Sequence, residues 1–166
     1  WPTKVDDGFN VAETPFKRDI LGELSKACDE AGLQLNFYYS LMDWHRKDYP
    51  AGTAAVKCLG PQKGDYESYK KFMLGQIGEL IDSYHPGNIW FDGEWDHKDP
   101  ETKMPNMDWK YDEIYSLIHT LQPRCLVLNN HHHALRDGED IYGVEREKKE
   151  DGKDQAFTLE PGHPSE

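Results

Sequence analysis

The sequence has little of what marks membrane, disulfide-rich or zinc-binding proteins. No apolar run reaches the roughly 18 residues that a membrane-spanning helix needs. The three cysteines, Cys28, Cys58 and Cys125, are too few and too scattered for a disulfide framework or a four-thiolate zinc site, and they leave the compartment open. Residues 1–4 do not have the layout of a signal peptide, and a chain without an initiating Met is expected to be processed, trimmed or partly represented.

Positive charge is also scarce. Lys and Arg together number 19 against 31 Asp and Glu, which gives a formal net charge of -12. Such a chain is a poor partner for the phosphates of a nucleic acid, so a neutral or weakly charged substrate fits better. With 166 residues, 37% of them hydrophobic, the chain is long enough for one domain with a core.

Helical and strand patterns alternate along the chain. Thr14 as an N-cap and Pro15 at the first helical position open a predicted helix that ends at Gly32. The remaining elements, recognised by apolar spacing and by Gly and Pro breaks, are strand 33–39, helix 66–84, strand 88–92, helix 111–121, strand 125–129 and a short strand 141–144. Residues 40–64, 94–108 and those after Glu145 are predicted loops.

This alternation predicts an α/β fold with a parallel sheet and right-handed crossovers. Long connections follow the strands and short ones precede them, as in a (β/α)8 TIM barrel, although a flavodoxin-like open sheet fits the pattern as well. A full barrel needs eight strands and about 250 residues, so residues 1–166 are expected to form only part of a catalytic barrel, with no second domain. The open edges and apolar face would need the rest of the barrel or a homo-oligomer.

The segment from Ile89 to Asp96 holds the main catalytic candidate. Asp92 ends a short apolar strand, where α/β enzymes place their chemistry, and Gly93 lets the chain turn at once. Trp90 lies two residues earlier and so points to the same side. An indole beside a carboxylate suits a sugar, because the ring packs on its C–H face while the acid attacks the anomeric carbon. An Asx turn at Asp92 and a core role for Trp90 are equally compatible with the pattern.

A second aromatic cluster and a histidine run follow the neighbouring strands. Only one of Tyr38 and Tyr39 can point inward, and Trp44 in the next loop is a further candidate for substrate binding. Residues 131–133 are histidines, but adjacent residues rarely converge on one metal ion. Hydrogen bonds from Asn130 and His131 to sugar hydroxyls are the favoured role, and solvent exposure explains the later histidines more simply.

A second carboxylate is needed if the chemistry is glycoside hydrolysis. A retaining enzyme holds its nucleophile and its acid/base about 5 to 5.5 Å apart, on different strand ends of a barrel. Glu139, Asp140 and Glu145 all follow the third strand, and any of them is a candidate for that role. Residues 147–151 are interpreted as a solvated charge run.

Several short motifs in one order resemble the α-L-fucosidases of glycoside hydrolase family 29. The matching segments are Asp7-Gly8-Phe9-Asn10, Thr14-Pro15-Phe16-Lys17-Arg18-Asp19, Phe37-Tyr38-Tyr39-Ser40, Leu41-Met42-Asp43-Trp44, Asp48-Tyr49-Pro50 and Ile89-Trp90-Phe91-Asp92-Gly93. The resemblance implies that Asp92 is the nucleophile, that Trp90 is a wall of the fucose pocket and that Tyr39 reaches the sugar hydroxyls. The family's Asn-Asp-Arg-like segment falls on residues 129–131, where His131 replaces the arginine.

The same resemblance implies Glu145 as the acid/base, five residues after Asp140, with Glu147 and Glu160 as alternatives. It implies no metal or organic cofactor, a fucosylated oligosaccharide or glycoconjugate as substrate, and a periplasmic, extracellular or lysosomal location. The family's His-His-Asp-Gly-Phe stretch would lie just before Trp1. The chain is therefore expected to begin inside the barrel and to lack the final strands and the β-sandwich that commonly follows.

The sequence thus favours a retaining exo-glycosidase that releases terminal α-L-fucose. Two alternatives remain open. The chain is compatible with a non-catalytic carbohydrate-binding or structural fragment of such an enzyme. It is also compatible with a barrel glycosidase that acts on another sugar.

Overall fold

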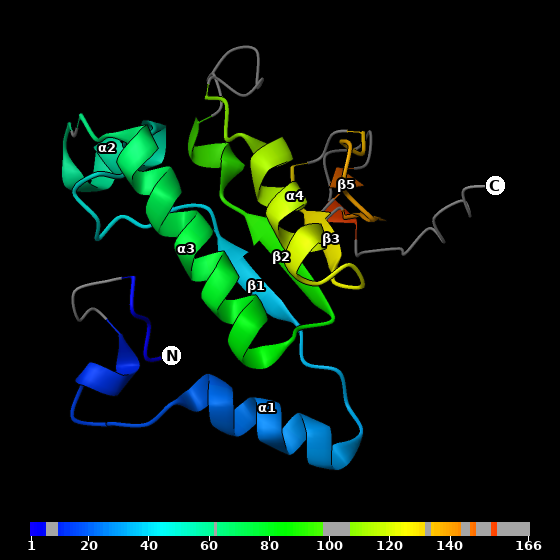
Figure 1. Cartoon of the computed structure of the whole chain (residues 1–166). Helices are drawn as coiled ribbons and strands as arrows, with labels where there is room; N and C mark the ends of the chain where they lie inside the picture. Colours follow the sequence, from blue (N-terminus) through cyan, green and yellow to red (C-terminus); the bar gives the residue numbers. More distant parts are fainter. Residues whose placement is uncertain are drawn as a thin grey trace.

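The computed structural model describes residues 1–5, 10–61, 63–97, 107–131, 134–143, 147–148 and 154–155. Four parallel strands form one sheet in the order β1-β2-β3-β4, which is also their order along the chain (Figure 1). Their bounds are Phe37–Ser40, Asn88–Asp92, Leu126–Asn129 and Ile141–Tyr142. The predicted parallel α/β fold is confirmed. Beyond Glu145, where a loop was expected, the short strands β5 (Glu147–Lys148) and β6 (Asp154–Gln155) pair antiparallel.

The helices complete the alternation. They are α1 (Ile20–Ala31), α2 (Thr53–Leu59), α3 (Tyr66–Tyr84) and α4 (Tyr111–Leu121), with two short 3-10 helices, η1 (Val11–Glu13) and η2 (Glu94–His97). The predicted bounds of the second and third helices are confirmed by α3 and α4. Among the described residues, no helix is long and apolar enough to cross a membrane.

The predicted start of the first helix is wrong. The helix begins after Asp19, whose carboxylate accepts a hydrogen bond from the Gly22 amide at 3.0 Å, and not after Thr14. Lys17 adopts a left-handed backbone conformation with φ of 52°, which breaks any helix running through Thr14 to Asp19. The predicted end is confirmed, because Gly32 takes the left-handed conformation of a helix C-cap.

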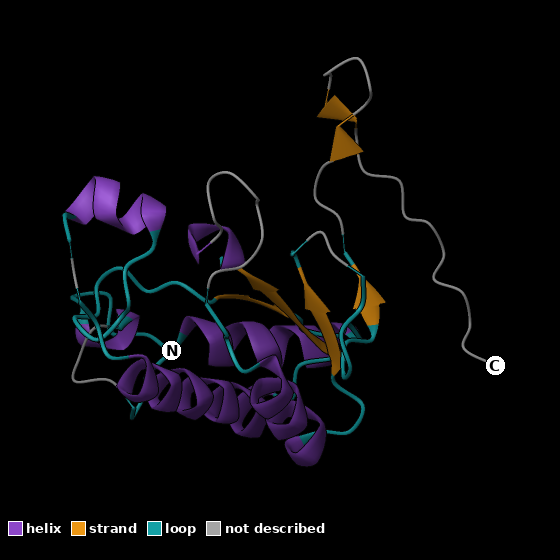
Figure 2. Cartoon of the chain, turned by 90° about the horizontal axis from the view of Figure 1, so that it is seen from above, coloured by secondary structure: helices purple, strands orange, loops and turns teal. Residues whose placement is uncertain are grey.

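The sheet has one covered and one open face. Phe37, Ile89, Phe91 and Val127 are buried beneath the longer helices α1, α3 and α4, which Figure 2 shows along one side of the sheet. Side chains alternate along a strand, so the intervening residues point the other way. On that face Tyr38 is 61% exposed.

This arrangement is that of part of a (β/α) barrel. In a doubly wound sheet the strand order reverses at a switch point and helices cover both faces. Here the order is sequential and the longer helices α1, α3 and α4 lie on one side. In a complete barrel the open face would be the interior, and the carboxyl ends of the strands would carry the active site.

Two loops at the carboxyl ends of the strands are tied together by Asp96 of η2. Its carboxylate is fully buried and accepts hydrogen bonds from the Tyr49 hydroxyl at 2.7 Å and from the Ala54 and Ala55 amides at 2.7 and 3.0 Å. Asp96 therefore caps α2, a helix that was not predicted from the sequence. Gly52 precedes α2, and a Cβ there would lie 2.1 Å from the Asp96 carbonyl oxygen, so only glycine fits.

Replacing Asp96 with Ala is expected to lower the free energy of unfolding by roughly 2 to 4 kcal/mol, because buried donors lose a charged acceptor. Urea denaturation of the variant would measure this, with the exposed Asp82→Ala on α3 as the control. Equal midpoints for the two variants would show that Asp96 does not hold the loops.

The contribution of Asp96 is also expected to depend on pH. Burial alone would raise the pKa of this carboxyl, but hydrogen bonds from Tyr49 and from the Ala55 and Ala54 amides outweigh it and hold the pKa below its ordinary 3.8. A carboxyl with a lowered folded-state pKa stabilises the fold above its unfolded pKa and loses that effect as pH falls through the folded value. The difference between wild type and Asp96→Ala should therefore be constant near neutral pH and shrink below about pH 4.

Candidate active site

Side chains from three neighbouring strands meet on the open face of the sheet. In the strand register Tyr38 of β1 is paired with Trp90 of β2, and Ser40 is paired with Asp92. Paired residues of parallel strands point to the same face. Asn130 follows β3 directly, and its amide nitrogen donates to the Phe91 carbonyl at 2.9 Å. These strand ends surround Asp92.

Both oxygens of the Asp92 carboxylate accept hydrogen bonds. Oδ2 accepts from the Tyr38 hydroxyl at 2.7 Å, and Oδ1 accepts from the Gly93 amide at 2.7 Å. A longer contact of 3.5 Å joins the Asn130 Nδ2 to Oδ1. The donors come from β1 and from the residues that directly follow β2 and β3, so the carboxylate is held in one orientation.

Gly93 allows the chain to turn sharply behind the carboxylate. Its φ of 117° is a conformation that side chains disfavour, and a Cβ would lie 2.9 Å from the Cγ of Met42. After this turn the backbone continues directly into η2. Asp92 therefore ends the strand with its side chain on the open face.

Trp90 lies on the same face, as the two-residue spacing predicted. Its ring is half-buried, and its indole Nε1 is buried with no hydrogen-bond partner among the described residues. Such a ring offers an apolar surface and a donor to a bound molecule beside Asp92. Trp44, in the loop after β1, is partly buried against the hydrophobic core.

The structure places Tyr39 on the covered face and brings Tyr38 to Asp92 in its place. Tyr39 is 7% exposed, and its hydroxyl donates to the Oε1 of Gln76 on α3 at 2.9 Å. Burial raises the pKa of its phenol above the ordinary value. The strand alternation left the choice open, and only the register between β1 and β2 settles which tyrosine shares a face with Asp92.

His131 turns away from Asp92. It is 1% exposed, and its Nε2 lies 2.8 Å from Oε2 of Glu139. The two histidines after it lie outside the described residues. Among the residues that the structure describes, no cluster of His, Cys, Asp and Glu side chains is arranged to hold a metal ion.

The candidates for a second carboxylate divide into two groups. Glu145, Glu160 and the side chain of Glu147 lie outside the described residues. Glu139 bonds to the Tyr115 hydroxyl of α4, on the covered side of the sheet, at 2.6 Å. Asp140 accepts from the Val127 amide near the start of β3, away from the carboxyl end, at 2.8 Å. The structure brings neither of these two to Asp92.

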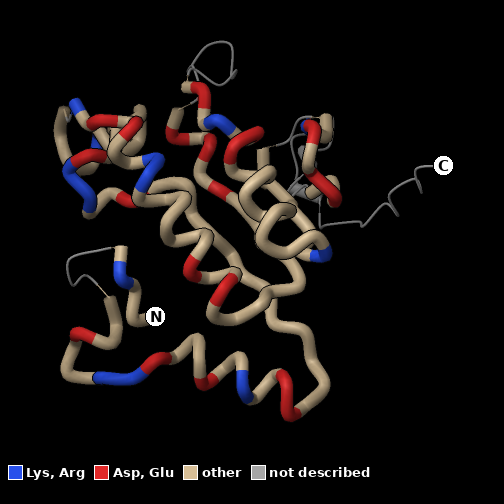
Figure 3. The backbone as a smooth tube through the Cα atoms, in the orientation of Figure 1, with Lys and Arg blue, Asp and Glu red and all other residues tan. Residues whose placement is uncertain are grey.

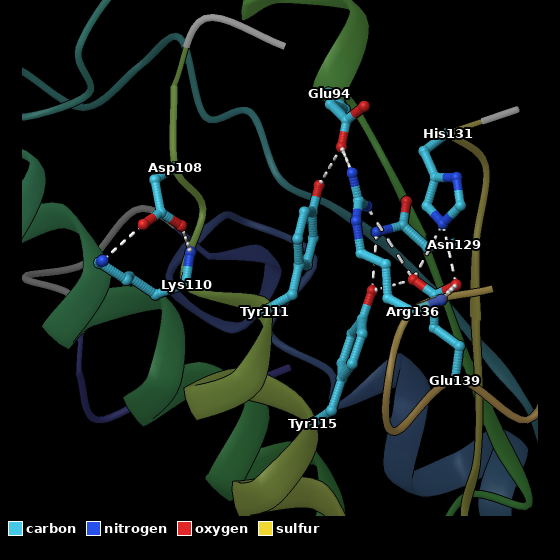
Figure 4. A network of polar contacts seen from close by, with 9 residues as sticks. All are labelled: Glu94, Asp108, Lys110, Tyr111, Tyr115, Asn129, His131, Arg136 and Glu139. Carbon is cyan, nitrogen blue, oxygen red and sulfur yellow. Dashed lines mark hydrogen bonds and ion pairs between the residues drawn. The ribbon is translucent and has the colours of Figure 1, made fainter. Parts of the chain in front are cut away.

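A buried polar network behind the strand ends was not expected from the sequence (Figure 4). Glu94, two residues after Asp92, is 1% exposed and accepts from Arg136 and from the Tyr111 hydroxyl, each at 2.9 Å. The Arg136 guanidinium also lies over the Tyr111 ring, 4.4 Å from its centre. A charged residue in a predicted loop gives no local signal of burial, so only the tertiary contacts identify this pair.

Acidic residues are numerous near the strand ends, and two of them, Glu94 and Asp96 of η2, are buried. Figure 3 shows Asp and Glu over η2 and the beginning of α4, whereas Lys and Arg lie mainly along the loop that carries α2. The polar groups nearest Asp92 are neutral hydroxyl, indole and amide groups. This environment suits a neutral, hydroxyl-rich ligand better than an anion.

Comparisons with known proteins identify the family of the chain. The family model described as Alpha-L-fucosidase matches residues 1–161. Putative alpha-L-fucosidase 1 of Oryza sativa subsp. japonica is 30% identical over 134 residues, which cover 78% of this chain and 22% of that protein. Tissue alpha-L-fucosidase of Homo sapiens is 29% identical over 114 residues, which cover 68% of this chain and 23% of that protein.

Solved structures give the same relationship. The Thermotoga maritima alpha-fucosidase in complex with fucose matches with a TM-score of 0.54 and 32% identity, covering 76% of this chain and 28% of that one. A variant of alpha-L-fucosidase AlfC in complex with Fuca(1,6)GlcNAc matches with a TM-score of 0.51 and 29% identity, covering 75% of this chain and 41% of that one.

The chain spans less than a quarter of the length of the two curated relatives described above. The match nevertheless covers almost all of the chain, including the strand that ends at Asp92. The parallel sheet agrees with a partial match to the barrels of solved fucosidases. The chain belongs to the α-L-fucosidases of glycoside hydrolase family 29.

Proposed function

We propose that the protein carrying this chain is a retaining exo-α-L-fucosidase and that residues 1–166 are part of its catalytic barrel. The observation that carries the proposal is the setting of Asp92, an aspartate at a strand end with both oxygens held by neighbouring donors and with Trp90 beside it. Bound fucose in one related structure and Fuca(1,6)GlcNAc in another support a fucosylated oligosaccharide or glycoconjugate as substrate.

The proposed reaction is a double displacement. Asp92 forms a bond to the anomeric carbon of fucose while the glycosidic C–O bond breaks and Glu145 gives its proton to the leaving oxygen. Glu145 then takes a proton from water, whose oxygen attacks the same carbon and displaces Asp92. Two inversions release fucose with its original configuration. The assignment of Glu145 rests on the family resemblance, with Glu147 and Glu160 as alternatives.

Four further residues around Asp92 have proposed roles. Tyr38 donates a hydrogen bond to Oδ2 of Asp92, and the Gly93 amide and the Asn130 side chain donate to Oδ1. Trp90 provides the apolar wall against which the C–H face of the sugar packs. The donors orient a lone pair of the carboxylate toward the sugar, which contributes to rate through positioning.

Replacing Asp92 with Gly in the full-length protein should reduce hydrolysis of an aryl α-L-fucoside by at least about 10³-fold, because the covalent step is lost. Azide should restore part of the activity, since it fits the space left by the carboxylate and attacks the anomeric carbon. The Asp82→Gly variant provides an exposed aspartate as control. Unchanged turnover in Asp92→Gly would reject Asp92 as nucleophile.

Two outcomes with the wild-type protein would point to the alternatives. Binding of fucose without turnover, measured by titration calorimetry, would indicate a carbohydrate-binding or structural role. Turnover of a different sugar in a panel of aryl glycosides would indicate a barrel glycosidase of another specificity.

Tyr38→Phe should lower kcat on an aryl fucoside by roughly tenfold to a hundredfold, because a hydrogen bond to a charged group contributes about 1.5 to 3 kcal/mol. Tyr39→Phe removes a hydroxyl from the next residue on the opposite face, where it bonds to Gln76, and should keep wild-type kcat. Steady-state kinetics would compare the two. A larger loss in Tyr39→Phe would reverse the assignment of the two tyrosines.

Glu145→Gln should reveal the acid/base by its dependence on the leaving group. A phenol of low pKa leaves without protonation, whereas a sugar leaving group needs a proton. The variant should therefore lose at least about tenfold more activity on a fucosylated disaccharide than on an activated aryl fucoside. Glu147→Gln and Glu160→Gln are the matched variants, and the same pattern in one of them would move the role there.

A further inference from the structure

Glu139 is the centre of a buried hydrogen-bond network on the covered side of the sheet (Figure 4). Its side chain is 1% exposed. Oε1 accepts from the Tyr115 hydroxyl at 2.6 Å, and Oε2 lies 2.8 Å from Nε2 of His131 and 3.1 Å from the Arg136 amide. The Tyr115 hydroxyl in turn accepts from Nδ2 of Asn129 at 2.9 Å. One carboxylate thus gathers side chains from α4, from β3 and from the turn after β3.

The two residues held by this network flank Asn130. Asn129 is joined to Glu139 through Tyr115, and His131 is joined to it directly. Asn129 ends β3 and His131 lies in the bend that follows, and the contacts of both side chains on the covered side leave the open face to the residue between them. Asn130 is thereby turned to the open face, where its amide contacts Oδ1 of Asp92 at 3.5 Å.

The backbone at this position is fixed by the neighbouring strand. The Asn130 amide nitrogen donates to the carbonyl of Phe91, the residue before Asp92, at 2.9 Å. The backbone hydrogen bond to Phe91 fixes the position of Asn130 along the strand direction. The Glu139 network determines the face to which the Asn130 side chain points. Together these contacts define the position of one donor to Asp92.

Arg136 connects the same network to the strand of Asp92. Its guanidinium lies 2.9 Å from Oε2 of Glu94, which follows Asp92 by two residues, and 4.0 Å from Oε1 of Glu139. The arginine lies between two buried carboxylates, one behind each strand end. Neither carboxylate is left without a cationic neighbour, which meets the requirement for burying such charges.

Glu139 is suited to this role in its ionised form. Burial alone would raise the pKa of its carboxyl, but hydrogen bonds from His131, Tyr115 and the Arg136 amide outweigh it and hold the pKa below the ordinary value. An ionised carboxylate accepts from all of its neighbours at once, whereas an amide in its place would have to present a donor to one of them.

We propose that Glu139 is a positioning residue, which places Asn130 against the Asp92 carboxylate by holding Asn129 and His131 on the opposite face of the sheet. The role deepens the proposed function, on which it rests. Glu139 does not touch the substrate, and it acts through the strand end between the two faces.

The first test compares Glu139→Gln with Asp137→Asn in the full-length protein. Asp137 lies in the same loop, is exposed and undergoes the same loss of charge. Glu139→Gln should lower kcat on an aryl α-L-fucoside roughly tenfold to a hundredfold, since misplacement by about 1 Å has effects of this size, with KM changed by less than about threefold. Asp137→Asn should match the wild type in both constants.

Tyr115→Phe provides the same test if Glu139→Gln does not fold, because it removes only the hydroxyl that joins Glu139 to Asn129. Asn130→Ala should reproduce the kcat loss, and combining it with Tyr115→Phe should add little, as expected for residues that act through one another. Additive losses in the double variant, or wild-type kcat in both single variants of the network, would overturn the proposal.

Crystal structures of Tyr115→Phe and Asp137→Asn without substrate separate this inference from the proposed function. The Asn130 amide should move away from Asp92 by about 1 Å or more in the former and stay in place in the latter. An unmoved Asn130 rejects the positioning role even if the wild type hydrolyses fucosides. If Asn130 is displaced but the wild type hydrolyses no fucoside, the proposed function is rejected. The inference that the network places Asn130 would still hold.

Discussion

The pairing register of β1, β2 and β3 determines to which face of the sheet each of their side chains points. Because Tyr38 lies beside Trp90 and Ser40 beside Asp92, one set of side chains faces the helices and the other set faces the open side. A shift of one residue would exchange the sets, burying Asp92 and exposing Phe91. The apolar residues beneath α3 and α4 therefore fix the active face as well as the core, since the energy of burying Ile89, Phe91 and Val127 opposes any slip.

Buried charges organise the loops that follow the strands. Asp96 joins the loop after β1 to the one after β2, while Glu94, Arg136 and Glu139 join the strand ends of β2 and β3 to α4. Each carboxylate accepts hydrogen bonds from at least two neighbouring groups, which lowers the cost of burying its charge. Polar contacts on the covered side thus hold the strand ends in place. The catalytic candidates on the open side are positioned by the same strand ends.

The sequence was sufficient where local chemistry decides the structure. The spacing of apolar residues gave α3, α4 and β2, and the break at Gly93 marked the strand end that carries Asp92. It was insufficient where a distant residue decides. The helix α2 has its cap on Asp96, more than forty residues away, and Gly52 offers no local cap signal. The choice between Tyr38 and Tyr39 needed the register with β2, and the burial of Glu94 needed Arg136.

The sequential order of the strands has a consequence for how this part of the protein is made. Each strand of the sheet pairs with the next one along the chain, and α3 packs against α4, so these contacts join segments that emerge from the ribosome one after another. Partners in β1, β2 and β3 are separated by helices and loops, so each closure has an entropic cost, which grows only slowly with the length of the connection. The strands can pair one after another during synthesis. The strand made last stays unpaired on one side until the next strand is translated.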